Sequence, residues 1–165
     1  MTMKLLAVAL TLTTRAVWAE DVPIEGTVQS RCTIQTDVPG VYGNPNAYTL
    51  TTTPADGGVL PVTRFDVTLA DAYYARVTHP DAFSSSPTLN DTVTFTGSTE
   101  VSAVGDANMS GYEAAKTTFG NSTQFDLTVA GSTWFKTSSE ATNGGEKAFP
   151  SGTYRAIVVA ECIAK

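Results

Sequence analysis

Polar and apolar residues alternate almost without error between Val22 and Ile34. A period of two is typical of a β-strand with one buried and one solvated face. The apolar face of this strand carries Val22, Ile24, Gly26, Val28, Cys32 and Ile34. The strand lies close to the N-terminus, where an alternating strand exposes an adhesive edge unless a partner binds it. The pattern therefore favours assembly by donation of this strand to another molecule.

Further alternating segments predict that the rest of the chain is mostly β. No window shows an apolar period of 3.6 residues, and Met109 to Lys116 is the one segment that suits a helical turn. The predicted strands span residues 48–52, 64–69, 73–78, 92–104, 124–129, 133–137 and 153–163. Short strands separated by turn residues favour an all-β fold, an immunoglobulin-like β-sandwich.

Finer expectations concern the interior of this sandwich. The side chains of Phe65, Val67 and Leu69 should point inward, because they alternate with polar residues. Gly97 should form a bulge in the strand that contains it. Residues 156–160 are apolar without interruption, so the last strand should be buried on both faces.

The first 19 residues have the pattern of a secretory leader. Lys4 precedes an apolar run from Leu5 to Leu12, and small side chains on both sides of Trp18 suit cleavage after Ala19. The run is too short to anchor the chain in a bilayer. We therefore expect residues 1–19 to be a signal peptide, residues 20–31 an N-terminal donor strand extension, and residues 32–165 one exported domain.

Charge and cysteine content narrow the choice of partners. Without the leader, eight basic residues oppose sixteen acidic ones, and such a negative surface repels phosphate. Nucleic acid and anionic lipid are therefore not expected as partners. Cys32 and Cys162 are the two cysteines, and we predict a disulfide between them because exported chains meet an oxidising environment. A metal site or a catalytic thiol is the alternative.

The residues give no clear indication of catalysis, and no cofactor is expected. The single histidine, His79, precedes a proline and is interpreted as a solvated loop residue. Zinc would need more ligands than this histidine and two paired cysteines provide. Asp56, Asp91 and Asp106 could hold calcium, but none lies in a dense ligand loop. A pair of distant carboxylates, as in a small hydrolase, is a weaker alternative.

Carbohydrate binding is the chief alternative function. Tyr73, Tyr74 and Trp134 could form a platform on which sugar rings stack, although aromatic residues of a sandwich more often belong to its core. Three Asn-x-Ser/Thr triplets, which begin at Asn90, Asn108 and Asn121, match the glycosylation pattern, in a chain where Ser and Thr are frequent.

Four features together resemble a pilin of the chaperone–usher class. They are the leader, the alternating strand directly after it, the β-rich domain, and a C-terminal strand opened by Pro150-Ser151-Gly152-Thr153-Tyr154. Such pilins typically carry a glycine near the fourteenth position from the C-terminus, followed closely by tyrosine. Here Gly152 is fourteenth from the end and Tyr154 follows it. Ala164 stands where many of these pilins have an aromatic residue, which indicates a divergent branch.

The resemblance implies an incomplete sandwich that the N-terminal extension of the next subunit completes. In such an arrangement main-chain hydrogen bonds extend a sheet while alternate side chains fill the core. The donor strand residues would be Val22, Ile24, Gly26 and Val28. The acceptor groove, with both cysteines beside it, would be lined by Tyr154, Ala156, Ile157, Val158, Val159 and Ile163.

We therefore expect a non-enzymatic structural subunit of an extracellular filament on the cell surface. The filament would be a pilus, or fimbria, that supports adhesion or biofilm formation. Its expected partners are identical or related pilin subunits, most simply in a homopolymer, together with a periplasmic chaperone and an outer-membrane usher. The alternative is a monomeric secreted β-sandwich that binds carbohydrate or a host surface.

Overall fold

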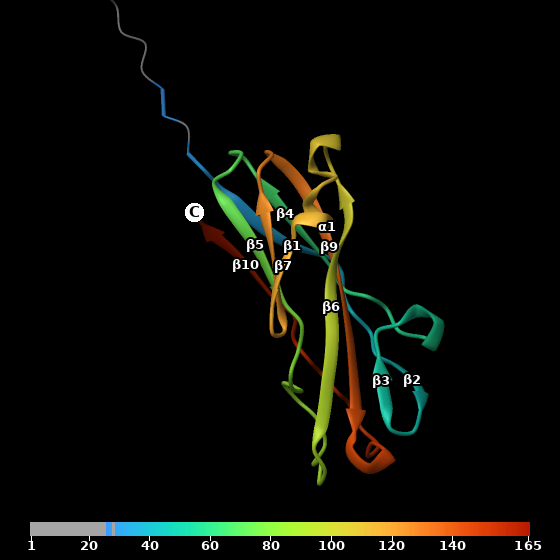
Figure 1. Ribbon diagram of the computed structural model, residues 1–165. Helices are drawn as coiled ribbons and strands as arrows, with labels where there is room; N and C mark the ends of the chain where they lie inside the picture. Colours follow the sequence, from blue (N-terminus) through green and yellow to red (C-terminus); the bar gives the residue numbers. More distant parts are fainter. Residues whose placement is uncertain (1–25, 28) are drawn as a thin grey trace, which may run out of the picture.

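The computed structural model describes residues 26, 27 and 29–165, and these residues form two antiparallel β-sheets (Figure 1). The predicted all-β class is confirmed. The expected signal peptide and the donor strand residues Val22, Ile24 and Val28 lie outside the described residues. Within the described part, no helix has both the length and the apolar character needed to cross a bilayer.

The first sheet is organised around its longest strand, β9 (Gly131–Asn143). Strand β6 (Val93–Val104) pairs along one edge of β9. The other edge is shared by β4 (Val62–Val67) and β3 (Thr49–Thr51). Strand β1 (Cys32–Val38) then pairs with β4, and β2 (Gly43–Asn46) pairs with β3. Among these, β1 and β6 lie at opposite sides of the sheet.

The second sheet has the order β10-β5-β8-β7. Its strands are β5 (Tyr73–Thr78), β7 (Thr117–Phe119), β8 (Ser122–Leu127) and β10 (Val159–Ala164). The short helix α1 (Tyr112–Ala115) lies within the predicted helical segment and precedes β7. Three 3-10 turns occupy Pro54–Asp56, Ala107–Met109 and Gly144–Glu146.

The core lies between the two sheets and is built by alternating side chains, as the sequence predicts for Phe65 and Val67. Phe135 of β9 is its centre, with its ring centroid 5.3 Å from that of Phe65 and 4.3 Å from that of Phe125. Each large apolar side chain that is fully buried contributes about 1.5 to 3 kcal/mol. The alternating strands of both sheets therefore supply the main stabilisation.

Two predicted positions are wrong. Leu69 is 41% exposed, because β4 ends at Val67. The register shift in β6 falls between Val101 and Ala103, and Gly97 stays in regular pairing with Ser139. A glycine is needed at position 97 because a Cβ atom there would lie 2.8 Å from the ring of His79.

The last strand is shorter and more exposed than predicted. Strand β10 begins at Val159, and the residues from 153 to 160 alternate between exposed and half-buried instead of being buried on both faces. The reason is topological, since β10 is an edge strand that pairs with β5 alone among the described strands.

Candidate functional site

The two sheets each present an unpaired strand edge on the same side of the molecule. Among the described strands, β1 pairs with β4 alone and β10 pairs with β5 alone. The predicted disulfide between Cys32 and Cys162 is confirmed, and it joins β1 to β10 with the two Cα atoms 6.2 Å apart. Figure 1 shows these strands side by side at the end of the domain where the C-terminus lies.

Away from the disulfide, the space between these edges opens into a groove of about 660 Å³. One wall comes from β1 and the residues that follow it, and the other comes from residues 152–158. The groove is lined by Thr36, Gly40, Val41, Tyr42, Leu50, Thr52, Pro61, Thr63, Pro80, Ser139, Gly152, Thr153, Tyr154, Arg155, Ala156, Ile157 and Val158.

The inner face of β1 is poorly covered beside this groove. Ile34 pairs in register with Phe65, so both side chains belong to the inner face of the first sheet. Phe65 is fully buried, whereas Ile34 is 37% exposed. An apolar side chain at the edge of the core therefore remains open to solvent.

Backbone groups on both walls are oriented for strand pairing. The N–H of Arg155 donates to the carbonyl of Ser85 at 2.8 Å, and its carbonyl accepts from the N–H of Ser84 at 2.8 Å. Backbone groups alternate in direction along an extended chain, so those of Tyr154, Ala156 and Val158 point away from that loop and toward the groove. On the opposite wall, the residues of β1 that do not bond to β4 likewise present their N–H and C=O groups outward.

An aromatic cluster fixes the wall formed by residues 152–158. The ring of Phe83 lies in its middle, 4.8 Å from Phe95, 5.1 Å from Tyr154, 6.0 Å from Phe149 and 6.2 Å from Tyr42, measured between centroids. Such tilted and edge-to-face pairs are favourable beyond the area they bury. This cluster packs residues 152–158 against the loop at Phe83 and connects them to Tyr42 of the other wall.

The groove is mostly neutral. Its lining offers several hydroxyl groups, and the hydroxyls of Tyr42 and Ser139 form a hydrogen bond of 2.8 Å. Burial raises the pKa of Tyr42, and its hydrogen bond with Ser139 only partly opposes this. Arg155 is the one charged residue in the described lining, and it forms no ion pair within the described part of the chain.

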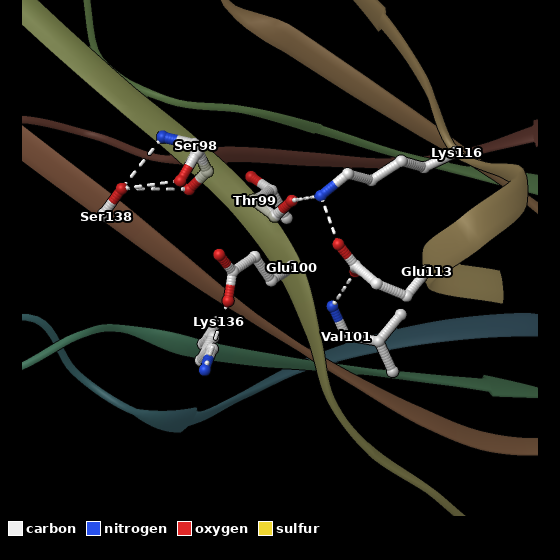
Figure 2. Close-up of polar contacts among 8 residues, drawn as sticks. All are labelled: Ser98, Thr99, Glu100, Val101, Glu113, Lys116, Lys136 and Ser138. Carbon is white, nitrogen blue, oxygen red and sulfur yellow. Dashed lines mark hydrogen bonds and ion pairs between the residues drawn. The ribbon is translucent and has the colours of Figure 1, made fainter. Parts of the chain in front are cut away.

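The free edge of β6, on the far side of the first sheet, is instead covered by side chains (Figure 2). The Val101 N–H donates to Oε2 of Glu113 at 2.8 Å, and Nζ of Lys116 donates to the Thr99 carbonyl at 3.1 Å. Glu113 and Lys116 also form an ion pair with each other. We call these two side chains the β6 clamp, since they occupy backbone groups that another strand would use.

Few contacts join the domain to the described residues that precede Cys32. Gly26, Thr27, Gln29 and Ser30 are exposed, and no atom lies within 4 Å of the position of a Cβ on Gly26. Arg31 is tied to the domain by a hydrogen bond of 2.9 Å from its N–H to Oγ1 of Thr68. Ser30 Oγ and the Tyr73 hydroxyl form a hydrogen bond of 2.7 Å, and Oγ1 of Thr68 donates to the Gln29 carbonyl at 3.4 Å, so contacts with the domain begin at Gln29.

The structure places the predicted acceptor residues in two groups. Tyr154, Ala156, Ile157 and Val158 line the groove. Val159 and Ile163 lie in β10, beyond the groove and on the strand that carries Cys162. The remaining lining, which includes Tyr42, Thr52, Ser139 and Arg155, was missed because it comes from segments far apart in the sequence, with no common motif.

The residues of the alternative sites are not brought together. Trp134 is on the outer face of the first sheet, while Tyr74 is on the outer face of the second and Tyr73 packs against the core. His79, interpreted above as solvated, is half-buried against Gly97, and its backbone N–H donates to the Asn121 carbonyl at 3.0 Å.

The acidic loop residues have structural partners. Asp91 pairs with Lys147 at 2.6 Å, and Asp106 accepts a hydrogen bond of 2.8 Å from the Asn108 N–H at the start of a 3-10 turn. Asp56 ends another such turn. Within residues 26, 27 and 29–165, no three His, Cys, Asp or Glu side chains are grouped as metal ligands would be.

Comparison with protein-family models, with curated proteins and with solved structures finds no match to this chain. The geometry of the groove is therefore the basis for the functional assignment.

Proposed function

We propose that this chain is a structural, non-enzymatic subunit of an extracellular filament. In this proposal the domain is an immunoglobulin-like sandwich that lacks one strand, and the N-terminal segment of another copy supplies it. The observation that carries the proposal is the groove between the open edge of β1 and the extended residues 152–158 that precede β10, with the partly exposed inner side chain of Ile34 beside it.

A strand placed in the groove would find both kinds of partner that a sheet offers. The backbone groups of Tyr154, Ala156 and Val158 are available on one wall, and those of β1 on the other. The alternating segment from Val22 to Val28 has the matching pattern, since its apolar side chains would enter the core. Burial of these side chains and of Ile34 supplies the driving force.

The β6 clamp supports the same assignment from the opposite side of the first sheet. Soluble β-proteins protect free edges against unwanted pairing. Here the edge at Thr99 and Val101 is occupied by side chains. The edges beside the groove are left open, which is the distribution expected if strand addition takes place at the groove.

The proposed partners follow from this mode of assembly. The chain would polymerise with identical or related subunits into a pilus that supports adhesion or biofilm formation on the cell surface. Before assembly, the groove exposes apolar surface, so a periplasmic chaperone would cover it and an outer-membrane usher would release subunits into the filament. The expected leader at residues 1–19 is the export signal for this route.

Deletion of residues 20–29 tests the proposal. We expect the truncated chain to form no filaments, because it has no strand to donate, while its own groove still accepts a donor. Electron microscopy and sedimentation of secreted material measure the loss. A matched control replaces the segment with one of the same composition in which apolar and polar residues no longer alternate, and this chain should also fail to assemble.

Normal filaments from either variant would overturn the proposal. Addition of a synthetic peptide of residues 20–31 provides a second readout, because it should bind the truncated chain and raise its thermal stability. A truncated chain that is monomeric and fully stable, and whose thermal stability the peptide does not change, would instead favour the monomeric sandwich.

A further inference from the structure

The groove has a single charged residue in its described lining, Arg155, and the segment proposed to enter it is acidic. Residues 20–29 contain Glu20, Asp21 and Glu25 and no basic residue. Five other basic side chains of the described domain are held in ion pairs, whereas Arg155 is exposed and, like Arg31 and Arg76, has none. Its backbone is fixed by hydrogen bonds to Ser84 and Ser85, so the point at which its side chain leaves the wall is defined.

Glu25 and Arg155 would lie on the same face of the completed sheet. Tyr154, Ala156 and Val158 are half-buried, while Arg155 between them is exposed and therefore on the outer face. In the donor, Ile24 and Gly26 belong to the apolar face that enters the core, so Glu25 between them faces outward. Opposite charges on adjacent strands of one face attract each other.

We propose that Arg155 of one copy pairs with Glu25 in the N-terminal segment of the next copy, and that this pair sets the register of the donated strand. The inference rests on the proposed function, which supplies the occupant of the groove. It adds a specific contact, because strand addition alone would tolerate several registers.

Side-chain sizes agree with this register when the strands are antiparallel. With Glu25 beside Arg155, Gly26 lies beside Tyr154, Ile24 beside Ala156 and Val28 beside Gly152. Gly26 leaves space for the Tyr154 ring, and Ala156 leaves space for Ile24. Val28 likewise lies beside a residue without a side chain, Gly152. A slip of two residues in either direction would place Ile24 or Val28 beside Tyr154, which crowds the groove.

The antiparallel direction also suits propagation of a filament. Gly152 precedes Cys162 by ten residues, so it lies about 30 Å from the disulfide along an extended chain. Residues 29–31 of the same domain directly precede Cys32 and so lie at the disulfide end. An antiparallel donor would enter from the Gly152 end, so each copy receives a strand at one end and donates one at the other.

A charge-exchange experiment tests the pair. The chain lacking residues 20–29, whose groove no other copy fills, is prepared with Arg155 and as Arg155→Glu. Binding of a fluorescent peptide of residues 20–31, native or Glu25→Arg, is measured by anisotropy. Each single reversal should weaken binding about five- to tenfold, because a favourable cross-strand pair becomes a repulsive one. The affinity of the Arg155→Glu chain for the Glu25→Arg peptide should return to within about twofold of that of the native pair. Added salt should reduce these differences in affinity.

Arg31→Glu is the matched control, since Arg31 is also an exposed arginine but lies outside the groove. It should leave the affinity for the native peptide unchanged. Equal binding of the native peptide to the chain with Arg155 and to Arg155→Glu, with unchanged melting temperatures, would overturn the Arg155–Glu25 pair and leave the groove as the donor site. Absence of binding by any peptide, together with filaments from the chain lacking residues 20–29, would overturn both proposals.

Discussion

Gly152 shows how one residue shapes the groove. Its φ angle is +153°, a conformation that residues with a Cβ atom rarely adopt, and a Cβ there would lie 2.5 Å from Cγ of Pro87. The proline ring cannot move away freely, because the neighbouring Ser85 pairs with Arg155. The glycine therefore lets residues 152–158 approach the loop that supports them.

We predict that Gly152→Ala destabilises the domain by about 1 to 3 kcal/mol, through overpacking against Pro87 and backbone strain. Chemical denaturation of the two mature chains measures the difference. Gly111→Ala is a suitable control, because Gly111 has φ −80° and no atom within 4 Å of a Cβ at its position. Equal stability of the native chain and Gly152→Ala would contradict the role given to this glycine.

At the level of elements, two of the outer strands of the first sheet, β1 and β6, differ in how their free edges are covered. The edge of β1 is open, whereas the edge of β6 is occupied by the β6 clamp.

Partial burial on its own would raise the pKa of Glu113. Hydrogen bonds from Lys116 and the Val101 N–H, with the charges of Lys116 and Lys136, outweigh it and bring the pKa below the ordinary 4.5. The stabilising contribution of this carboxylate is thus present above pH 4.5 and is lost as the pH falls through the lowered value.

We predict that the double variant Glu113→Ala, Lys116→Ala stays folded but self-associates, because it exposes the backbone groups of Thr99 and Val101. Its melting temperature should change little, since exposed ion pairs contribute about 0 to 1 kcal/mol. Light scattering at increasing concentration detects the association. The control Glu100→Ala, Lys136→Ala removes an ion pair of 3.2 Å between β6 and β9 without uncovering the edge (Figure 2). Association of the control to the same extent would argue against the clamp.

For the whole molecule, the disulfide closes a loop between residues 130 positions apart. In the chain-entropy model, a crosslink of this span stabilises the native state by about 5 kcal/mol. It also keeps β1 and β10 together at one end of the groove, where no backbone ladder joins them.

We predict that reduction of the disulfide, or the double variant Cys32→Ser, Cys162→Ser, lowers the melting temperature by about 10 °C or more. Calorimetry with and without reductant measures the change, and the double variant should show no further response to reductant. A native melting temperature in the absence of the crosslink would show that packing alone holds the two sheets together.

The sequence predicted those parts of the fold in which apolar and polar residues alternate. Strand β5 matches its predicted range, and Phe65 and Val67 are buried as expected. Strand β9 was predicted only from residue 133 to 137, because buried positions beyond this range carry the polar residues Ser139 and Asn143. Because these buried residues are polar, the sequence does not distinguish the buried positions of this part of the strand from its solvated ones.

The groove could be predicted only in part. Residues near Gly152 and Tyr154 were identified through the family resemblance and a run of apolar residues. The opposing residues, such as Tyr42 and Ser139, come from other strands, and the supporting Phe83 is in a loop. Such contacts depend on tertiary packing, which local periodicity does not encode.

The position of the disulfide has a mechanical consequence in a filament of the proposed kind. Tension along the filament would enter each domain at Cys32 and leave through the donated strand, which β1 and residues 152–158 hold. The force would reach one wall directly through β1 and the other wall across the crosslink and β10. The segment that joins the two walls, residues 39–151, would lie outside these two load paths while the bond is intact. Such a filament would resist stretching up to the strength of its strand-to-groove contacts, and a broken filament would release folded subunits.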